Sequence, residues 1–245
     1  MPGYAMTSEV TSLFPADTKA LRQEIIETAR ALPRLGLTKG TSGNVSARTA
    51  TGFLITPSGT PYEDLREDGI VALDFEGCYR GDVLPSSEWR MHLDFYQAKP
   101  ACGAVVHCHS PRATALACHR RGIPAFHYMV ALAGGDRIEC AAYASFGTRA
   151  LSEAIVAALG ERNACLLANH GQIAGGPTLK KALSVAEGVE DLSDQYLSSI
   201  ALGEPVILDA REMADILKKF KSYGKQTKEL EDGQAAAFEL PKRVD

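Results

Sequence analysis

The sequence predicts an α/β fold in which a central, mainly antiparallel sheet lies between two layers of helices. Short β-like runs, such as residues 53–56 and 104–109, are interspersed with segments whose apolar residues keep helical spacing. These strands and helices do not follow the regular βαβ period that would build a parallel sheet. A three-layer α/β/α arrangement around a largely antiparallel sheet is therefore expected.

The elements can be placed in order along the chain. Asp17 or Thr18 can cap a first helix, which Gly36 would end, and a loop rich in glycine and hydroxyl residues follows at 40–44. The remaining predicted helices cover residues 88–99, 112–121, 150–159, 178–201 and 211–223, and the predicted strands cover 53–56, 70–73, 104–109 and 164–168.

The chain contains no internal repeat and no linker rich in proline or serine, so a single domain is expected. Its 245 residues are ample for one large buried core. We expect the domain to cover residues 18–224. An N-terminal extension at 1–17 and a polar, loosely ordered tail at 225–245 would flank it.

Composition excludes several classes of function. Hydrophobic residues make up 45% of the chain and charged residues 23%, as in an ordinary globular protein. The net charge of −4 provides no basic field for nucleic acid or anionic lipid. No run approaches the roughly 18 apolar residues of a membrane helix, and residues 1–16 do not resemble a signal peptide. Six dispersed cysteines without a CxxC pair favour reduced thiols and a cytoplasmic location.

Three histidines are candidates for a metal site. His107 and His109 lie two residues apart in a β-like run, so both side chains point to the same face of the strand. His170 follows the apolar run 164–168, at a strand end where functional groups often emerge. Three imidazoles with an open fourth position make a catalytic zinc site. Each histidine could instead be a partly buried structural residue, and the residues alone leave both interpretations open.

Glu88 and several small polar residues are candidates for the rest of a site. A carboxylate beside a metal can be a ligand, a general base, or both in turn. Alternatively, Glu88 is a favourable charge at a helix N-terminus. Glycines allow the backbone to approach a phosphate, and hydroxyls and amides donate to it. An oxyanion cradle is predicted from residues that could also form ordinary turns: Gly43, Asn44, Ser58, Gly59, Ser86 and Ser87.

Short segments throughout the chain carry a resemblance to known proteins: Arg34–Leu37, Gly40–Ser46, Leu54–Gly59, Pro85–Arg90, Ala104–His109, Ile123–Met129, Tyr143–Thr148, Asn169–Gly171 and Phe220–Gly224. Through them the sequence resembles the class II aldolase/adducin family over about residues 21–223. The HxH, SSE and HG elements mark the family. The segments around Tyr128, Phe146 and Tyr223 look specific to its fuculose-phosphate aldolase branch.

The resemblance implies a metal centre and a phosphate site. His107, His109 and His170 would bind one Zn²⁺ per subunit. Glu88 would be the acid/base carboxylate, adjacent to the metal or bound to it in the free enzyme. The cradle residues defined above would hold the phosphate of the substrate. The implied reaction is reversible cleavage of L-fuculose 1-phosphate, or a similar ketose 1-phosphate, to dihydroxyacetone phosphate and L-lactaldehyde.

The resemblance also implies that subunits share their sites. The family assembly is a homotetramer with active sites at the subunit interfaces. Tyr128 would reach a neighbouring subunit's site and handle the proton on the aldehyde oxygen, and Tyr223 would lie near the substrate in a mobile C-terminal segment. The expected partner is thus a small phosphorylated sugar, with neither nucleic acid nor membrane involved.

Two alternatives remain on the same scaffold. The first is another metal-dependent sugar-phosphate reaction: a ribulose-phosphate 4-epimerase, another aldolase, a dehydratase or a decarboxylase. The epimerase pattern typically has aspartate at the position of Glu88, which argues mildly against it. The second is a non-catalytic, adducin-like interaction domain. Such domains lose the metal histidines, whereas all three are present in this chain.

Overall fold

A computed structural model describes residues 14–223, 230 and 236–238 of the chain. Residues 1–13 of the predicted N-terminal extension lie outside the described part, and so does most of the predicted tail at 225–245. The described part of the extension contacts the domain. The guanidinium of Arg48 lies 4.8 Å from the centre of the Phe14 ring, and the amide of Ala50 donates to the carbonyl of Pro15.

The central layer is a seven-stranded sheet with the strand order β3-β2-β1-β4-β7-β6-β5. Neighbouring strands are antiparallel except β5 and β6, which are parallel, so the predicted mainly antiparallel sheet is confirmed. Strand β4 lies in the middle, between β1 and β7. The strands are β1 (Asn44–Thr49), β2 (Gly52–Ile55), β3 (Val71–Asp74), β4 (Ala104–Cys108), β5 (Cys140–Ala141), β6 (Ala164–Leu167) and β7 (Gly171–Gly176).

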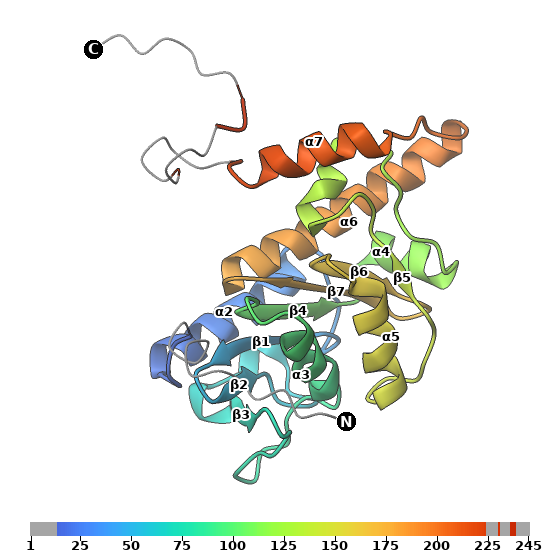
Figure 1. The fold of residues 1–245 in the computed structure, drawn as a ribbon. Helices are drawn as coiled ribbons and strands as arrows, with labels where there is room; N and C mark the ends of the chain where they lie inside the picture. The colour runs from blue at the N-terminus through green and yellow to red at the C-terminus, as the bar shows by residue number, and fades with distance from the viewer. Residues whose placement is uncertain (1–13, 224–229, 231–235, 239–245) are drawn as a thin grey trace.

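Helices cover both faces of the sheet, which confirms the three layers (Figure 1). Helices α2, α4 and α6 share one hydrophobic core with the sheet, and α3 and α5 share a second core on the opposite face. The helices are α2 (Lys19–Arg34), α3 (Trp89–Ala98), α4 (Pro111–Cys118), α5 (Arg149–Leu159), α6 (Leu179–Leu202) and α7 (Ala210–Phe220), with 3₁₀ helices η1 (Tyr62–Asp64), η2 (Glu67–Gly69) and η3 (Tyr128–Ala133).

The alternation of side chains along β4 decides which face the site uses. Ala104, Val106 and Cys108 belong to the core beneath α2 and α6, whereas Val105 belongs to the core beneath α3 and α5. His107 is offset by two residues from Val105 and points to the same side. The first predicted metal ligand therefore faces the layer that contains α3.

Several local predictions agree with the structure. Thr18 caps α2 by accepting a hydrogen bond from the amide of Leu21. The six cysteines are all free thiols. Within the described residues, none of the helices is long and apolar enough to cross a membrane.

Three strands are missing from the sequence-based prediction, namely β1, β7 and the two-residue β5. In addition, the last helix ends at Phe220, three residues before the predicted Tyr223, so Tyr223 lies in the turn that follows α7. Every residue of β1 and β7 is buried, so neither strand shows alternation of exposed and buried residues, and neither has the continuous apolar run that marked the equally buried β2, β4 and β6. The sequences of β1 and β7 are also unusual for buried strands, since β1 is polar and β7 contains three glycines.

Candidate metal and substrate site

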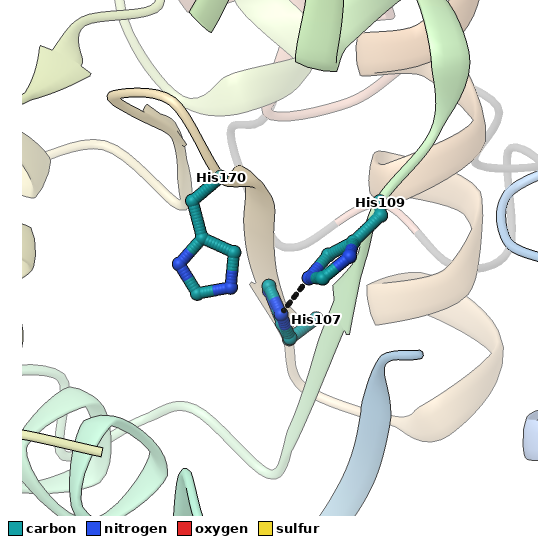
Figure 2. A group of neighbouring side chains, drawn as sticks. All are labelled: His107, His109 and His170. Carbon is teal, nitrogen blue, oxygen red and sulfur yellow. Dashed lines mark hydrogen bonds between the residues drawn. The ribbon is translucent and has the colours of Figure 1, made fainter. Parts of the chain in front are cut away.

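The three candidate histidines meet at one end of β4. His107 is in the strand itself, His109 follows it, and His170 occupies the turn between β6 and β7. Strands β4 and β7 are paired with Cys108 opposite Gln172, which brings His170 beside the other two. The ring centres are 4.8–4.9 Å apart, and the candidate ligand nitrogens all lie within 4.8 Å of one another. Figure 2 shows the three rings grouped around a common point.

Hydrogen bonding sets which nitrogen of His107 faces that point. Nδ1 of His107 lies 2.8 Å from the carbonyl oxygen of Gln172, so Nδ1 carries the hydrogen and donates it. Nε2 is therefore left as an acceptor, 3.1 Å from Nε2 of His109 (dashed line in Figure 2). Metal-binding histidines commonly donate their other ring N–H to a backbone carbonyl in this way, which fixes the tautomer and the ring orientation.

Glu88 lies against the same group of imidazoles. The residue precedes the first turn of α3, and its Oε2 and Oε1 atoms lie 3.2 Å from Nε2 of His107 and Nε2 of His170 respectively. Oε1 is buried, and within the described residues it accepts no hydrogen bond. A buried carboxylate oxygen directed at imidazole nitrogens, without a donor of its own, fits a position beside a cation.

The charges of the group support the same interpretation. Burial raises the pKa of Glu88, but the neighbouring His107 and His170 outweigh it and hold the pKa well below its ordinary value. Burial lowers the pKa of His109 to about 4, and the two adjacent imidazoles contribute to this shift. The carboxylate is thus ionised and His109 is neutral at pH 7, which are the forms that bind a metal.

A cleft of about 440 Å³ opens directly beside Glu88, His109 and His170. Its lining contains every residue of the predicted oxyanion cradle: Gly43, Asn44, Ser58, Gly59, Ser86 and Ser87. Hydrogen bonds join the two serine-containing loops, because the amide of Ser86 donates to the carbonyl of Thr56 and the amide of Ser58 to that of Leu84. The structure therefore brings together cradle residues that are up to 44 positions apart in the chain.

Gly43 is required where the cradle meets the histidines. Its φ angle is +97°, which L side chains rarely adopt, and a Cβ atom there would lie 2.7 Å from the carbonyl oxygen of His107. The glycine thus allows the cradle backbone to approach the metal-site strand.

Tyr128 and Tyr223 are not part of this cleft. Tyr128 begins η3, has 45% of its surface exposed and stacks on the ring of His127. Tyr223 is 60% exposed and stacks on Phe220. Helices η3 and α7 pack against each other through a small apolar cluster that includes Ala131, Met213 and Leu217. Within one chain, the two tyrosines therefore lie away from the histidines.

The cleft also contains residues that the sequence-based prediction did not assign to the site. Tyr143 and Phe146, which are 57% and 69% exposed, supply an aromatic wall. Thr41 and Ser42 extend the cradle. Asn169 lines the cleft with a φ of +55°, a left-handed conformation that is uncommon outside glycine. Apart from the resemblance of the surrounding segments, no local pattern in the sequence distinguishes these residues from ordinary loop residues.

Comparison with known proteins defines the class of this fold and site. Residues 23–197 match the model of the "Class II Aldolase and Adducin N-terminal domain" family. The chain is 53% identical over 210 residues to the 5-methylthioribulose-1-phosphate/5-deoxyribulose-1-phosphate aldolase of Rhodospirillum rubrum, covering 86% of this chain and 95% of that protein. It is 50% identical over 210 residues to the L-fuculose phosphate aldolase of Escherichia coli, covering 85% and 98% respectively.

A solved structure described as L-fuculose 1-phosphate aldolase matches with a TM-score of 0.81 and 40% identity, covering 86% of this chain and 99% of that one. The chain belongs to the class II aldolase family, and within it to the aldolases, which are carbon–carbon lyases. Class II aldolases depend on a metal ion, and the three histidines form a group that can bind one.

Proposed function

We propose that this protein cleaves a ketose 1-phosphate between C3 and C4, reversibly, to dihydroxyacetone phosphate and a short aldehyde. The main support for the proposal is that one cleft contains both a candidate metal site and a candidate phosphate site. The triad of His107, His109 and His170 adjoins Glu88, and the oxyanion cradle lines the same cavity. A ketose 1-phosphate has its phosphate two atoms away from its ketone carbon, so it can contact both.

The cradle supports binding of the phosphate end. Gly43 and Gly59 have no side chain, so backbone atoms line the cleft at these two positions. Hydroxyl groups are contributed by Ser58, Ser86 and Ser87. Such neutral donors can hold a dianion without a lysine or arginine side chain. Binding the phosphate here would place the ketone and its neighbouring hydroxyl toward the histidines.

The donor set fits a zinc ion held by His107, His109 and His170, with Glu88 as a fourth ligand in the free enzyme. When bound, the ion would supply Lewis acidity that stabilises the negative charge on the substrate oxygens as the carbon–carbon bond breaks. Three imidazoles also suit manganese or cobalt, so metal analysis of the purified protein is part of the test.

Glu88 is proposed to move the proton at carbon. In the condensation direction its carboxylate takes a proton from the hydroxymethyl carbon of dihydroxyacetone phosphate, and in cleavage it returns that proton. Its position beside both the cradle and the imidazoles supports this role. Ionisation of Glu88 in the free protein is the state needed for a base.

Tyr128 is proposed to act on the aldehyde oxygen in the site of a neighbouring subunit. Its exposure and its absence from the cleft of its own chain support a role across an interface. This role requires an oligomer, and we propose the homotetramer with shared sites that the resemblance implies, in which Tyr223 would approach the substrate from the segment after α7. We further propose that the protein acts in the cytoplasm.

The substrate is tested by a panel of three ketose phosphates. The candidate aldehydes are L-lactaldehyde from L-fuculose 1-phosphate, acetaldehyde from 5-deoxyribulose 1-phosphate, and methylthioacetaldehyde from 5-methylthioribulose 1-phosphate. The last two compounds are included because the relative of 53% identity is named for them. Release of dihydroxyacetone phosphate is measured before and after zinc is stripped and restored.

Zinc-restored release from one of the three compounds, with the highest kcat/KM, would identify the substrate. Release from none of them by protein that holds stoichiometric metal would refute the proposal. The epimerase, dehydratase and decarboxylase reactions would then be tested with pentulose phosphates.

A further inference from the structure

A line of buried polar side chains leads from Glu88 into the core between α3 and β1. Glu88, His92 and Tyr96 are spaced by four residues, so they lie along one face of the helix. Asn44 and Ser46 are spaced by two residues and lie on one face of the strand. The two rows face each other, and their members alternate.

Each member of the line hydrogen-bonds to the next. Nδ2 of Asn44 lies 3.0 Å from Oε2 of Glu88, and Oδ1 of Asn44 lies 2.5 Å from Nε2 of His92. Nδ1 of His92 lies 2.7 Å from Oγ of Ser46, which in turn lies 2.7 Å from the hydroxyl of Tyr96. Four hydrogen bonds thus cross between the helix and the strand on the way from the hydroxyl of Tyr96 to the carboxylate of Glu88.

The hydrogens along this line must all point toward Glu88. A carboxylate only accepts, so Asn44 turns its Nδ2 to Glu88 and its Oδ1 to His92. Nε2 of His92 therefore carries a hydrogen, and Nδ1 of the neutral ring accepts one from Ser46. Ser46 is then left to accept from Tyr96. Aligned hydrogen bonds of this kind polarise and strengthen one another.

Burial keeps the line free of competing water. Ser46, His92 and Tyr96 have no exposed surface, and Asn44 is only 3% exposed. Burial also lowers the pKa of His92 to about 3, so its ring is neutral at pH 7. A core of this size does not need such a polar line, because well-packed apolar residues stabilise equally well. A fully bonded polar line in the core instead suggests that one geometry is being specified.

We propose that His92, Ser46 and Tyr96 are positioning residues that act through Asn44 to hold the carboxylate of Glu88 toward the histidine centre. His92 fixes the amide of Asn44, because a flipped amide would turn its oxygen toward the carboxylate and its NH₂ group toward a donor. The Asn44 donor occupies Oε2, and Oε1 remains directed at His170. This role rests on the proposed function of Glu88.

Asn44 would also connect the two halves of the site. Its Nδ2 has two hydrogens, and one is directed to Glu88. Asn44 lines the cleft as well, so the second hydrogen is available on the side where the phosphate is proposed to bind. The orientation set by His92 therefore acts mainly on the carboxylate, because the other five cradle residues do not depend on it for phosphate binding.

The main test compares His92→Leu with His92→Gln, using the full-length, metal-loaded protein. Leucine fills the space without a hydrogen bond, whereas glutamine can donate to Asn44 and accept from Ser46. In His92→Leu we expect kcat for cleavage and for proton exchange into dihydroxyacetone phosphate to fall by about 10–100-fold, with KM and metal content changed by less than about threefold. His92→Gln should recover most of the loss.

A second, milder variant with its own control keeps the proposal testable if His92→Leu does not fold. Tyr96→Phe removes one oxygen at the far end of the line and should lower kcat by about two- to fivefold. Its matched control is Tyr196→Phe, because Tyr196 is a buried tyrosine of α6 whose hydroxyl accepts from Arg121 instead. Ser46→Ala and Ser193→Ala form a second matched pair of fully buried serines. The control variants should keep wild-type kcat within about twofold.

Two kinetic outcomes would overturn the positioning role. One is wild-type kcat in both His92→Leu and Tyr96→Phe. The other is an equal loss of kcat in the two control variants, because this would indicate a general loss of packing.

An NMR experiment tests the positioning role independently of the proposed function, because it does not require catalytic activity. Nitrogen NMR of the histidine side chains should show His92 neutral with its hydrogen on Nε2, and that proton signal should shift in Glu88→Gln. A hydrogen on Nδ1, or a signal indifferent to Glu88→Gln, would overturn the positioning role. If the wild-type protein neither cleaves nor exchanges, the proposed function fails, and the NMR result alone decides whether the line orients Glu88.

Discussion

Oε2 of Glu88 lies 3.2 Å from Nε2 of His107, so the residue that precedes α3 meets a side chain from the central strand β4. The contact joins a helix start to the middle of the sheet. It also places an ionised carboxylate where three imidazoles converge.

Removing a candidate ligand should remove the metal. His107→Ala and His170→Ala should each lose bound zinc and reduce cleavage by at least about 10³-fold, because the Lewis acid contributes several kcal/mol to the transition state. Metal content by atomic spectroscopy and release of dihydroxyacetone phosphate would be measured together. His119→Ala, at an exposed position beyond α4, is the matched control and should keep both properties. Stoichiometric zinc in His170→Ala would contradict the ligand assignment.

Glu88→Gln should uncouple proton transfer from phosphate binding. Exchange of the hydroxymethyl proton of dihydroxyacetone phosphate should slow by about 10²–10⁴-fold, which is the usual contribution of a general base. Affinity for the same compound should remain largely intact, because the cradle is unchanged. Proton exchange is followed by NMR in deuterated water, with Glu153→Gln on the exposed side of α5 as the control. Exchange at the wild-type rate would exclude Glu88 as the base.

Tyr128→Phe should slow aldol turnover but spare proton exchange, because its hydroxyl is assigned to the aldehyde half. If each site combines Glu88 of one subunit with Tyr128 of another, two weakly active variants should complement each other. Unfolding and refolding Glu88→Gln together with Tyr128→Phe would give about a quarter of sites with both groups intact. Recovery of about a quarter of wild-type activity is expected. No recovery from mixed oligomers would place both residues in one subunit's site.

Gly43→Ala should disturb the cradle and the metal site together. The new Cβ would lie 2.7 Å from the carbonyl oxygen of His107, at a φ of +97°. We expect a loss of about 1–3 kcal/mol in the free energy of unfolding, measured by urea denaturation, and weaker zinc binding. Gly69→Ala is the matched control, because a Cβ there would meet nothing within 4 Å and its φ is ordinary. Equal stability of the two variants would contradict this account.

The metal-free protein should lose stability in mild acid. The folded pKa is about 3 for His92 and about 4 for His109, against 6.5 in the unfolded chain. From pH 6.5 down to pH 4 the unfolded chain therefore binds more protons, and the free energy of unfolding should fall by up to about 1.4 kcal/mol per pH unit for each histidine.

Urea denaturation at several pH values would measure this slope. His92→Gln should make it shallower, whereas His119→Gln should leave it unchanged. A slope that is the same in all three proteins would rule out His92 as a contributor.

Short-range signals singled out the candidate site residues, and the resemblance to a known family joined them into one predicted site. The spacing of His107 and His109 placed both on one strand face, and glycines and serines marked the cradle loops. The line from Tyr96 to Glu88 was not predicted, although its spacing of four residues is visible in the sequence. That spacing gains meaning only when β1 is known to lie opposite α3.

Strand β7 shows why part of the fold could not be predicted. Its glycines argue locally against a strand. The reason for Gly175 lies in a distant element, because a Cβ there would be 2.4 Å from the ring of Phe95 in α3. The contacts of Tyr128 could not be derived from local sequence for a similar reason, since the proposed site belongs to another subunit.

The third imidazole is in place only when β4 has paired with β7, so the affinity for the metal reports whether the sheet has formed completely. His107 and His109 are synthesised some sixty residues before His170, and only the register with Cys108 opposite Gln172 brings the third imidazole to them. A slip of β4 by one position would turn His107 into the apolar core beneath α6. During synthesis, a chain that ends before His170 contains two of the three imidazoles, and the third joins them only when β7 pairs with β4, so tight zinc uptake would begin only after the sheet has closed.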